Sequence, residues 1–170
     1  NRLMQMDERL RGSIGLTVSI FCAGTPSLAG TRELINRLGA SEASEINELR
    51  YRGNGWPGRM SVQLKPGDQK RVEPESITYA EGWGEILQKH KQWRCQLCVD
   101  HLGEHADLSI GDPWYRPIGD DEEGESLIVV RTERGRLALR AAVEAGYLVV
   151  ERRSIATLAA SQPNLEQTKG

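Results

Sequence analysis

The chain has 170 residues, of which 38% are hydrophobic and 27% are charged, and its formal net charge is −2. This length suits one domain with its own core, and the composition is ordinary for a globular protein. No basic block is present that would follow a phosphate backbone, so we expect no nucleic-acid partner. No apolar stretch approaches the roughly 18 residues that span a bilayer, so we expect no membrane association.

The two ends of the chain predict a piece of a longer polypeptide. It opens on Asn1 without a methionine and closes on a polar tail. We expect residues 1–12 to lead in from a preceding region, residues 13–158 to form the domain, and residues 159–170 to be a truncated tail. Three cysteines are an odd number and too few for a disulfide framework, which favours a reducing cytoplasm.

The first elements in chain order form a predicted β–loop–α unit. Residues 14–22 are a near-continuous β-branched run, typical of a strand buried on both faces. Residues 28–38 predict a helix that ends at Gly39, with Thr25 or Ser27 as its N-cap.

A β-hairpin is expected next. Residues 45–52 predict a strand that ends in the glycine-rich turn at 53–58, and residues 59–64 alternate as a second strand. After the turn that begins at Lys65, residues 69–72 are expected to return as the second arm of the hairpin.

The second half of the chain alternates strands and helices again. Tyr79, Trp83 and Trp93 have rough helical spacing and are expected to pack in the core. Strands and helices alternating at both ends favour an α/β (mixed α+β) single domain, with a central mixed sheet, flanking helices and a β-hairpin insertion. The expected elements are a helix in the second half of 76–93, strands at 106–110, 127–132 (buried) and 147–150, and a helix over 135–145 that stops at Gly146.

The cysteines carry the most chemical information. Cys95 and Cys98 form a Cys-x-x-Cys pair that can direct two thiolates at one soft metal, and Cys22 directly follows the first predicted strand. Thiolates in such places suit an iron–sulfur cluster, zinc or a redox dithiol. The dithiol hypothesis expects the pair at a helix N-terminus straight after a strand, whereas a polar helix is predicted before Cys95.

Zinc is the other alternative. Cys95, Cys98, His101 and His105 read C-x2-C-x2-H-x3-H. Zinc fingers usually place about a dozen residues between the two ligand pairs, whereas two residues intervene here. A non-enzymatic interaction module held by zinc on Cys95, Cys98 and a histidine stays open as the alternative function.

Three further sequence features are candidates for ligand binding. The loop from Arg52 to Gly58 offers backbone N–H groups and a guanidinium to a phosphate and the Trp56 ring for stacking, although it also suits a plain hairpin loop. Asp112 lies on a Gly-Pro turn, where it caps the turn or orients a cofactor. Arg131 and Thr132 end a predicted strand, where α/β folds place ligand groups and where salt-bridge partners are also common.

In chain order, four segments resemble the C-terminal region of the coenzyme F420 hydrogenase/dehydrogenase beta-subunit family: FCAGTPS, LRYRGNGWPG, WRCQLCVDHLGEHADLSIGDPW and SLIVVRTERGRLALRAA. The resemblance runs from about residue 13 to 157, and C-x-x-C-x-D followed by A-D-[LI]-S-x-G-D is its most specific part. It implies a flavin iron–sulfur protein with FAD and at least one [4Fe–4S] cluster. Such proteins pass electrons between a partner subunit or ferredoxin and a two-electron substrate, which is coenzyme F420 in some members and a chlorophyll precursor in others.

The resemblance also implies roles for residues. Cys22, Cys95 and Cys98 match the cluster ligands of this region, and the fourth ligand is expected from a glycine-proline-cysteine type motif of the N-terminal region. We expect no catalytic side chain, because the cofactors carry the redox chemistry. A degenerate member that keeps these sites only for folding is a further alternative. The residues expected to contact FAD are Arg52, Gly53, Asn54, Gly55, Trp56, Asp112, Arg131 and Thr132.

Overall fold

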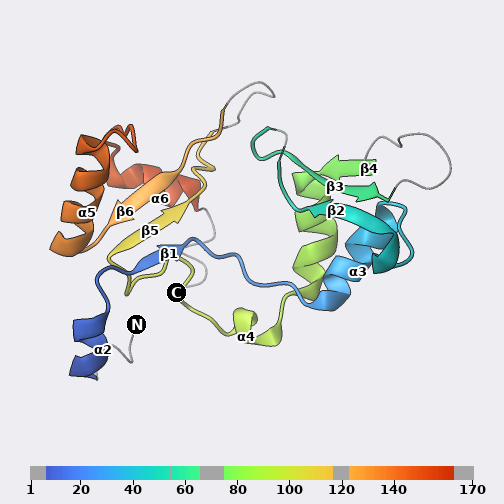
Figure 1. Cartoon of the computed structure of the whole chain (residues 1–170), viewed down its shortest axis with the longest axis horizontal. Helices are drawn as coiled ribbons and strands as arrows, with labels where there is room; N and C mark the ends of the chain where they lie inside the picture. Colours follow the sequence, from blue (N-terminus) through green and yellow to red (C-terminus); the bar gives the residue numbers. More distant parts are fainter. Residues whose placement is uncertain (1–6, 54, 66–74, 117–122, 163–170) are drawn as a thin grey trace. The chain divides into compact units, whose positions relative to one another are not determined.

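The computed structural model describes residues 7–53, 55–65, 75–116 and 123–162, and it confirms the mixed α/β class (Figure 1). The described residues divide into two compact units. Unit 1 takes residues 7–23, 98–116 and 125–162, and unit 2 takes 24–53, 55–65, 75–97 and 123–124. The elements in chain order are α2 (Glu8–Ser13), β1 (Val18–Ile20), α3 (Leu28–Arg37), η1 (Ala43–Glu45), β2 (Ile46–Arg50), β3 (Arg59–Leu64), β4 (Glu75–Thr78), η2 (Glu81–Ile86), η3 (Leu87–His90), α4 (Trp93–Gln96), β5 (Leu108–Gly111), β6 (Leu127–Val130), α5 (Glu133–Glu144) and α6 (Ile155–Ser161).

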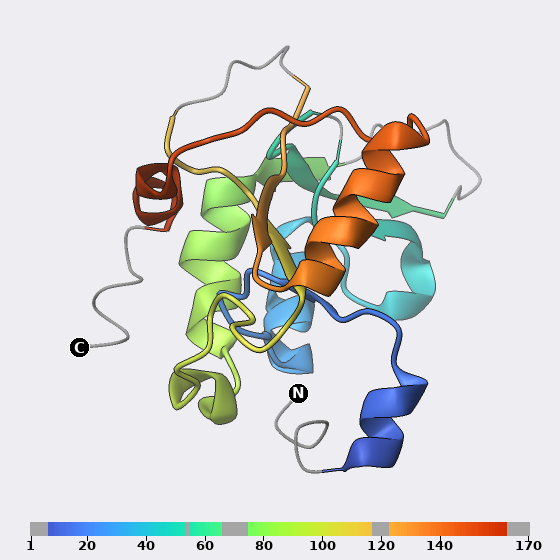
Figure 2. The same cartoon turned by 90° about the vertical axis from the view of Figure 1, so that its left-hand side faces the viewer.

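Unit 1 is built on a mixed sheet with the strand order β1-β5-β6. β1 runs parallel to β5, and β6 runs antiparallel to β5, so the expected mixed sheet is confirmed. α5 follows β6 directly and lies beside the sheet (Figures 1 and 2). The buried centre of this unit consists of Leu102, Ala106, Asp107, Leu108 and Ser109, together with Ser161 of α6.

The expectation that residues 14–22 form a strand buried on both faces is wrong. Only Val18–Ile20 are in β1, and the side chains of Val18 and Ile20 are 54% and 70% exposed. β1 lies at an edge of its sheet, where β5 is its one strand neighbour among the described residues. An apolar run predicts a strand but does not determine what covers its faces. β6 is likewise shorter than expected and half-buried rather than buried.

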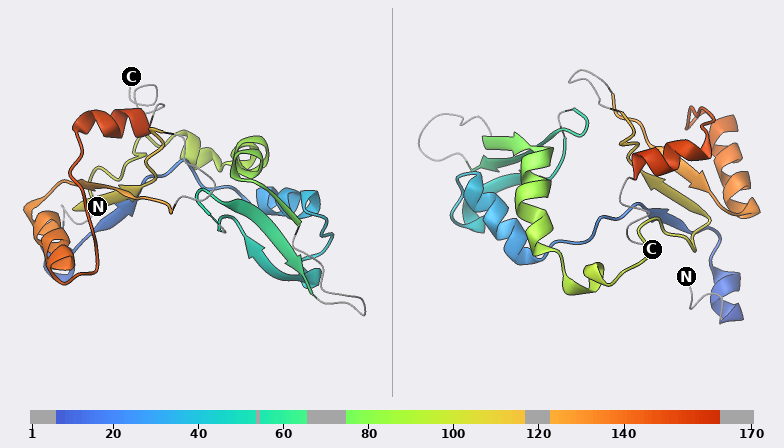
Figure 3. Two further views of the ribbon diagram at one scale, coloured as in Figure 1. Left: turned by 90° about the horizontal axis from the view of Figure 1, so that it is seen from above. Right: turned by 180° about the vertical axis from the view of Figure 1, so that it is seen from behind.

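Unit 2 consists of the antiparallel sheet β2-β3-β4 with α3, η2 and η3 on one face (Figure 3). Met60 and Val62 alternate along β3 and are 1% exposed, because both point into the core beneath the helices. That core is completed by Leu34, Ile35, Leu38, Ala40, Ile86 and Leu87. This hydrophobic core therefore joins β3 to helical segments that lie before and after the predicted hairpin in the chain.

The strands expected at 45–52 and 59–64 are confirmed as β2 and β3, and β4 adds a third strand to them. β2 and β3 pair in antiparallel register with Leu49 opposite Val62, and β4 pairs with the other edge of β3. The hairpin arm expected at 69–72 lies outside the described residues. The helical segment expected within 76–93 is present as η2, a π-helical turn, followed by the 3-10 turn η3.

Both long predicted helices are confirmed, one expected strand is wrong, and one helix was missed. α3 begins after Ser27 and ends before Gly39, which has φ +83°. α5 begins after the N-cap Thr132, whose hydroxyl accepts a hydrogen bond from the Gly135 N–H, and it ends before Gly146. The strand expected at 147–150 is wrong: this segment is exposed coil leading to α6, which the sequence reasoning missed. None of the helices within the described residues is long and apolar enough to cross a membrane.

Candidate functional site

Cys22 is held through its main chain in unit 1. It follows β1 by two residues, and its N–H donates to the His101 carbonyl at 2.9 Å. In return, Nδ1 of His101 lies 2.9 Å from the Cys22 carbonyl oxygen. A carbonyl only accepts, so Nδ1 is the donor and carries the proton. This reciprocal pair fixes the backbone of Cys22 while leaving its side chain exposed.

Cys95 lies in the short helix α4 of unit 2, against the segment that follows Cys22 in the chain. The Thr25 N–H donates to Sγ of Cys95 at 3.3 Å, and the Gln92 N–H donates to the Thr25 carbonyl at 3.0 Å. Gly24 has φ +108°, and a Cβ there would lie 3.3 Å from Cβ of Cys95. The close approach at Gly24 brings a backbone donor within reach of the sulfur.

Cys98 follows α4 in unit 1, where its thiol lies 3.6 Å from the Asp100 carbonyl. All three cysteines are free thiols, two of them exposed and Cys95 half-buried. Among the described side chains, no group of three or more His, Cys, Asp and Glu residues gathers as a metal site. The cysteines are divided between the units, since Cys22 and Cys98 belong to unit 1 and Cys95 to unit 2.

The chemistry of this donor set fits an iron–sulfur cluster. Free, accessible thiols are the groups that become thiolate ligands, and an N–H donor at the sulfur is a common way to stabilise such a ligand. The same thiols also suit the zinc alternative. Nδ1 of His101 donates to the Cys22 carbonyl, an arrangement that leaves Nε2 available as a metal ligand, and the side chain of His105 is exposed.

The glycine-rich loop after β2 is a tight turn of unit 2. Gly53 and Gly58 pair as an isolated bridge, and the Arg59 N–H donates to the Gly53 carbonyl at 3.1 Å. Gly58 has φ +76°, and a Cβ there would clash with the Gly53 carbonyl oxygen, so only glycine fits. Nε of Arg52 donates to the Pro57 carbonyl at 3.3 Å. Of the residues predicted here, Asn54 lies outside the described ones.

Unit 2 contains a cavity of about 340 Å³ beside this loop. The Tyr79 and Trp83 rings on its wall are stacked, with centroids 6.5 Å apart and planes at 5°. The Arg52 guanidinium lies 5.0 Å above the Tyr79 ring centroid. The remaining lining residues are Thr25, Pro26, Thr31, Tyr51, Met60 and Leu87. This is the composition of a small-molecule site, in which apolar and aromatic walls surround a few polar groups.

The expected packing of the aromatic residues is only partly correct. Tyr79 and Trp83 do pack against the core of unit 2, but they also line the cavity. Trp93 is 67% exposed, so its expected burial is wrong. Thr31 and Tyr51, whose hydroxyl oxygens lie 2.7 Å apart in the cavity wall, were missed. Helical spacing predicts which aromatic residues share a face of a helix. It does not predict whether other side chains cover that face or whether a cavity lies beside it.

The strand-end residues Arg131 and Thr132 bind their own unit. Arg131 donates to the Ser109 hydroxyl and, at 3.1 Å, to the Leu102 carbonyl. The Thr132 hydroxyl donates to Oδ1 of Asp107 at 2.5 Å. Asp112 is half-buried just after β5, and its carbonyl accepts from the Trp114 N–H at 3.2 Å.

Asp107 is a buried carboxylate that the sequence reasoning did not single out. Its Oδ2 accepts from the N–H and hydroxyl of Thr17 at 2.9 and 2.7 Å. The hydrogen bond from Thr132, then those from Thr17, and the charge of Arg134 hold the pKa of Asp107 below its ordinary value although burial opposes this. Asp107 thereby ties the start of β1 to the N-terminus of α5. Thr17 just before β1 and Thr132 just after β6 were the sequence signal that could have indicated a buried carboxylate partner such as Asp107.

Comparisons with known proteins agree with the motifs. Residues 1–155 match the family described as the C terminus of the coenzyme F420 hydrogenase/dehydrogenase beta subunit. The chain is 26% identical over 133 residues to the coenzyme F420 hydrogenase subunit beta of Methanococcus voltae. That match covers 78% of this chain and 40% of the relative.

Proposed function

Because the chain belongs to the coenzyme F420 hydrogenase/dehydrogenase beta-subunit family, we propose that it is part of a flavin- and iron–sulfur-dependent oxidoreductase or electron-transfer subunit. It holds a [4Fe–4S] cluster and FAD so that electrons pass between a partner subunit or ferredoxin and a small redox substrate such as coenzyme F420. FAD exchanges two electrons with a substrate and single electrons with a cluster, which is why one protein holds both. Free thiols suit the reducing cytoplasm as its location.

Cys22, Cys95 and Cys98 hold the cluster in this proposal, and a fourth ligand comes from outside this chain. Chain connectivity supports this set. Cys22 precedes Thr25 by three residues in the chain, and the Thr25 N–H donates to Sγ of Cys95. Cys98 follows Cys95 by three residues. The Thr25 N–H and the ring of His101 then position two of the three ligands.

The aromatic cavity of unit 2 is the observation that carries the flavin part of the proposal. Its volume of about 340 Å³ is near the lower end of ligand pockets, about 300–1,000 Å³, which suits a planar ring system better than a whole dinucleotide. Tyr79 and Trp83 offer flat apolar surfaces to a ring, and Arg52 supplies a cation beside it. The adjoining loop, with Gly53, Gly55 and Trp56, offers backbone N–H groups to phosphate.

The proposal gives different roles to the remaining three residues, Asp112, Arg131 and Thr132. Asp112 orients a polar group of FAD. Arg131 and Thr132 act as positioning residues, because their side chains hold the Leu102 carbonyl and the Asp107 carboxylate. No side chain is assigned a role as general acid or base.

The test is anaerobic purification of the full-length protein, followed by iron, acid-labile sulfide and flavin analysis. We expect all three in the wild type, loss of iron and sulfide in Cys95→Ser, and reduced flavin in Trp83→Leu. Trp93→Leu is the matched control, since Trp93 lies outside the cavity lining and is exposed. Absence of iron, sulfide and flavin from the wild type would refute the proposal. One zinc per chain without flavin would instead favour the zinc module.

A further inference from the structure

One segment at the surface of unit 2 combines positive charge with large apolar side chains; Lys91 is half-buried, and the other residues named next are exposed. It consists of Lys89, Lys91, Trp93, Arg94 and Leu97, which we call the 89–97 patch. We propose that this patch is the docking surface for a small acidic iron–sulfur protein of the ferredoxin class. The inference rests on the proposed electron-transfer function and names the place and the chemistry of the partner.

The charge of the patch is opposite to that of the whole chain. Residues 88–97 contain three cations and no Asp or Glu, whereas the chain as a whole carries −2. Lys89, Lys91 and Arg94 have no ion-pair partner among the described residues. Three unneutralised cations in one short segment attract an acidic protein surface and accelerate its encounter.

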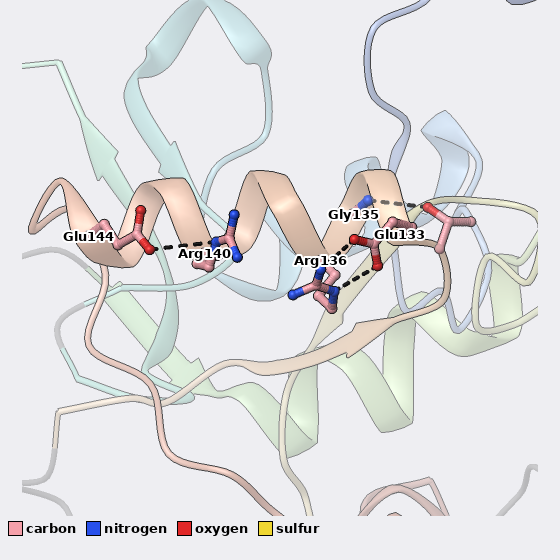
Figure 4. A network of polar contacts seen from close by, with 6 residues as sticks. Glu133, Gly135, Arg136, Arg140 and Glu144 are labelled. Carbon is pink, nitrogen blue, oxygen red and sulfur yellow. Dashed lines mark hydrogen bonds and ion pairs between the residues drawn. The ribbon is translucent and has the colours of Figure 1, made fainter.

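Several other surface cations have an ion-pair partner. On α5, Arg136 pairs with Glu133, and Nε of Arg140 lies 3.5 Å from Glu144 (Figure 4). In unit 2, Nε of Arg50 lies 2.6 Å from Glu48. In contrast to these paired arginines, the 89–97 patch brings three cations without an ion-pair partner in the described part of the chain into one short segment, residues 89–94.

The patch also has the apolar anchors that a specific contact needs. Trp93 and Leu97 are each 67% exposed, and they lie four residues apart across α4, which places them on one face. A tryptophan in such a position is a typical binding hot spot when a partner covers it. Two exposed apolar side chains in a segment that also carries three cations favour a protein partner over nucleic acid or a simple anion.

The patch is fixed next to a proposed cluster ligand. An ideal Cβ placed on Gly24 would lie 2.7 Å from the side-chain stem of Lys91 and 3.3 Å from Cβ of Cys95. The Cys95 N–H donates to the Gln92 carbonyl at 2.9 Å, and the Lys91 main chain bridges Pro26. A preformed surface loses little entropy on binding. A partner seated on it comes close to Cys95, as single-electron exchange requires.

The experiment measures binding of the full-length protein to an acidic bacterial 2[4Fe–4S] ferredoxin in its oxidised form, by calorimetry at low and high salt. We expect the Lys89→Gln, Lys91→Gln, Arg94→Gln triple variant to bind about tenfold more weakly at low salt, with most of the salt dependence lost. Trp93→Ser should weaken binding about tenfold at both salt concentrations. The charge-matched control is Arg9→Gln, Arg140→Gln, Arg152→Gln in unit 1, which should retain wild-type affinity.

Equal binding by the patch triple and the control triple would overturn the inference. So would absence of ferredoxin binding, or binding of an oligonucleotide with the same affinity and salt slope. Binding does not require the chain to hold a cofactor, so iron and flavin analysis of the same preparation is a separate readout. Ferredoxin binding without cofactors would refute only the proposed function, and cofactors without ferredoxin binding would refute only the docking site.

Discussion

Removal of the Asp107 carboxylate tests how unit 1 is held together. Asp107 is 8% exposed, and it accepts hydrogen bonds from the Thr17 N–H, the Thr17 hydroxyl and the Thr132 hydroxyl. A hydrogen bond to a charged group contributes about 1.5–3 kcal/mol, and bonds to one carboxylate do not simply add. We therefore expect Asp107→Ala to lower the free energy of unfolding of unit 1 by about 3 kcal/mol, and Asp107→Asn by about 1–2 kcal/mol.

The pH dependence of this effect has a definite sign. The pKa of Asp107 is lowered in the folded state, chiefly by the hydrogen bond from Thr132. The unfolded chain therefore binds the proton more tightly, and the carboxylate stabilises the fold above its unfolded pKa of about 3.9. The difference between wild type and Asp107→Asn should be constant from about pH 5 to 8 and shrink as the pH falls below about 4.

The assay is urea unfolding at several pH values, with amide hydrogen exchange of β1 and β5 to report on unit 1. Glu151→Ala is the control, because the Glu151 carboxylate is an exposed partner of Arg153 and should contribute less than about 1 kcal/mol. If Asp107→Ala costs no more than Glu151→Ala, or if the gap between wild type and Asp107→Asn widens on acidification, the assigned role of Asp107 is wrong.

Three further substitutions test other parts of the structure. Gly58→Ala should lower thermal stability by the equivalent of about 2 kcal/mol or more, because its Cβ would meet the Gly53 carbonyl and its φ is +76°. Met60→Ala should cost about 2–5 kcal/mol in urea unfolding, since Met60 is 1% exposed, whereas Leu28→Ala at 65% exposure should cost less than about 0.5 kcal/mol. His101→Ala should reduce iron content severalfold in the anaerobically purified full-length protein, because it removes the ring that fixes Cys22.

Matched variants separate these effects from general damage. Gly12 has no heavy atom within 4 Å of its ideal Cβ, so Gly12→Ala should leave stability unchanged or raise it. His105→Ala should leave iron content at the wild-type value. Equal losses in His101→Ala and His105→Ala would contradict the positioning role of His101, and loss of zinc with unfolding in both would favour the zinc module.

The local elements were the predictable part of the fold. The helix at 28–38, the strand at 59–64 and the helix at 135–145 have clear periodicity and clear stop signals, and each is present within a residue or two. The segment at 147–150 shows the limit of this reasoning. Its residues favour β-structure, but a strand needs hydrogen-bonding neighbours, and in the described part of the chain this segment has none.

The amino-acid sequence alone indicated the family, the mixed α/β class and the cysteines, because these depend on residue types at short, readable spacings. The tertiary structure decided three other features: which faces of β1 are covered, that Tyr79 and Trp83 border a cavity, and that Asp107 joins β1 to α5. Each depends on contacts between distant segments, such as the 90-residue separation of Thr17 and Asp107. Periodicity encodes the direction of a side chain within its own element, and only packing determines what that side chain meets.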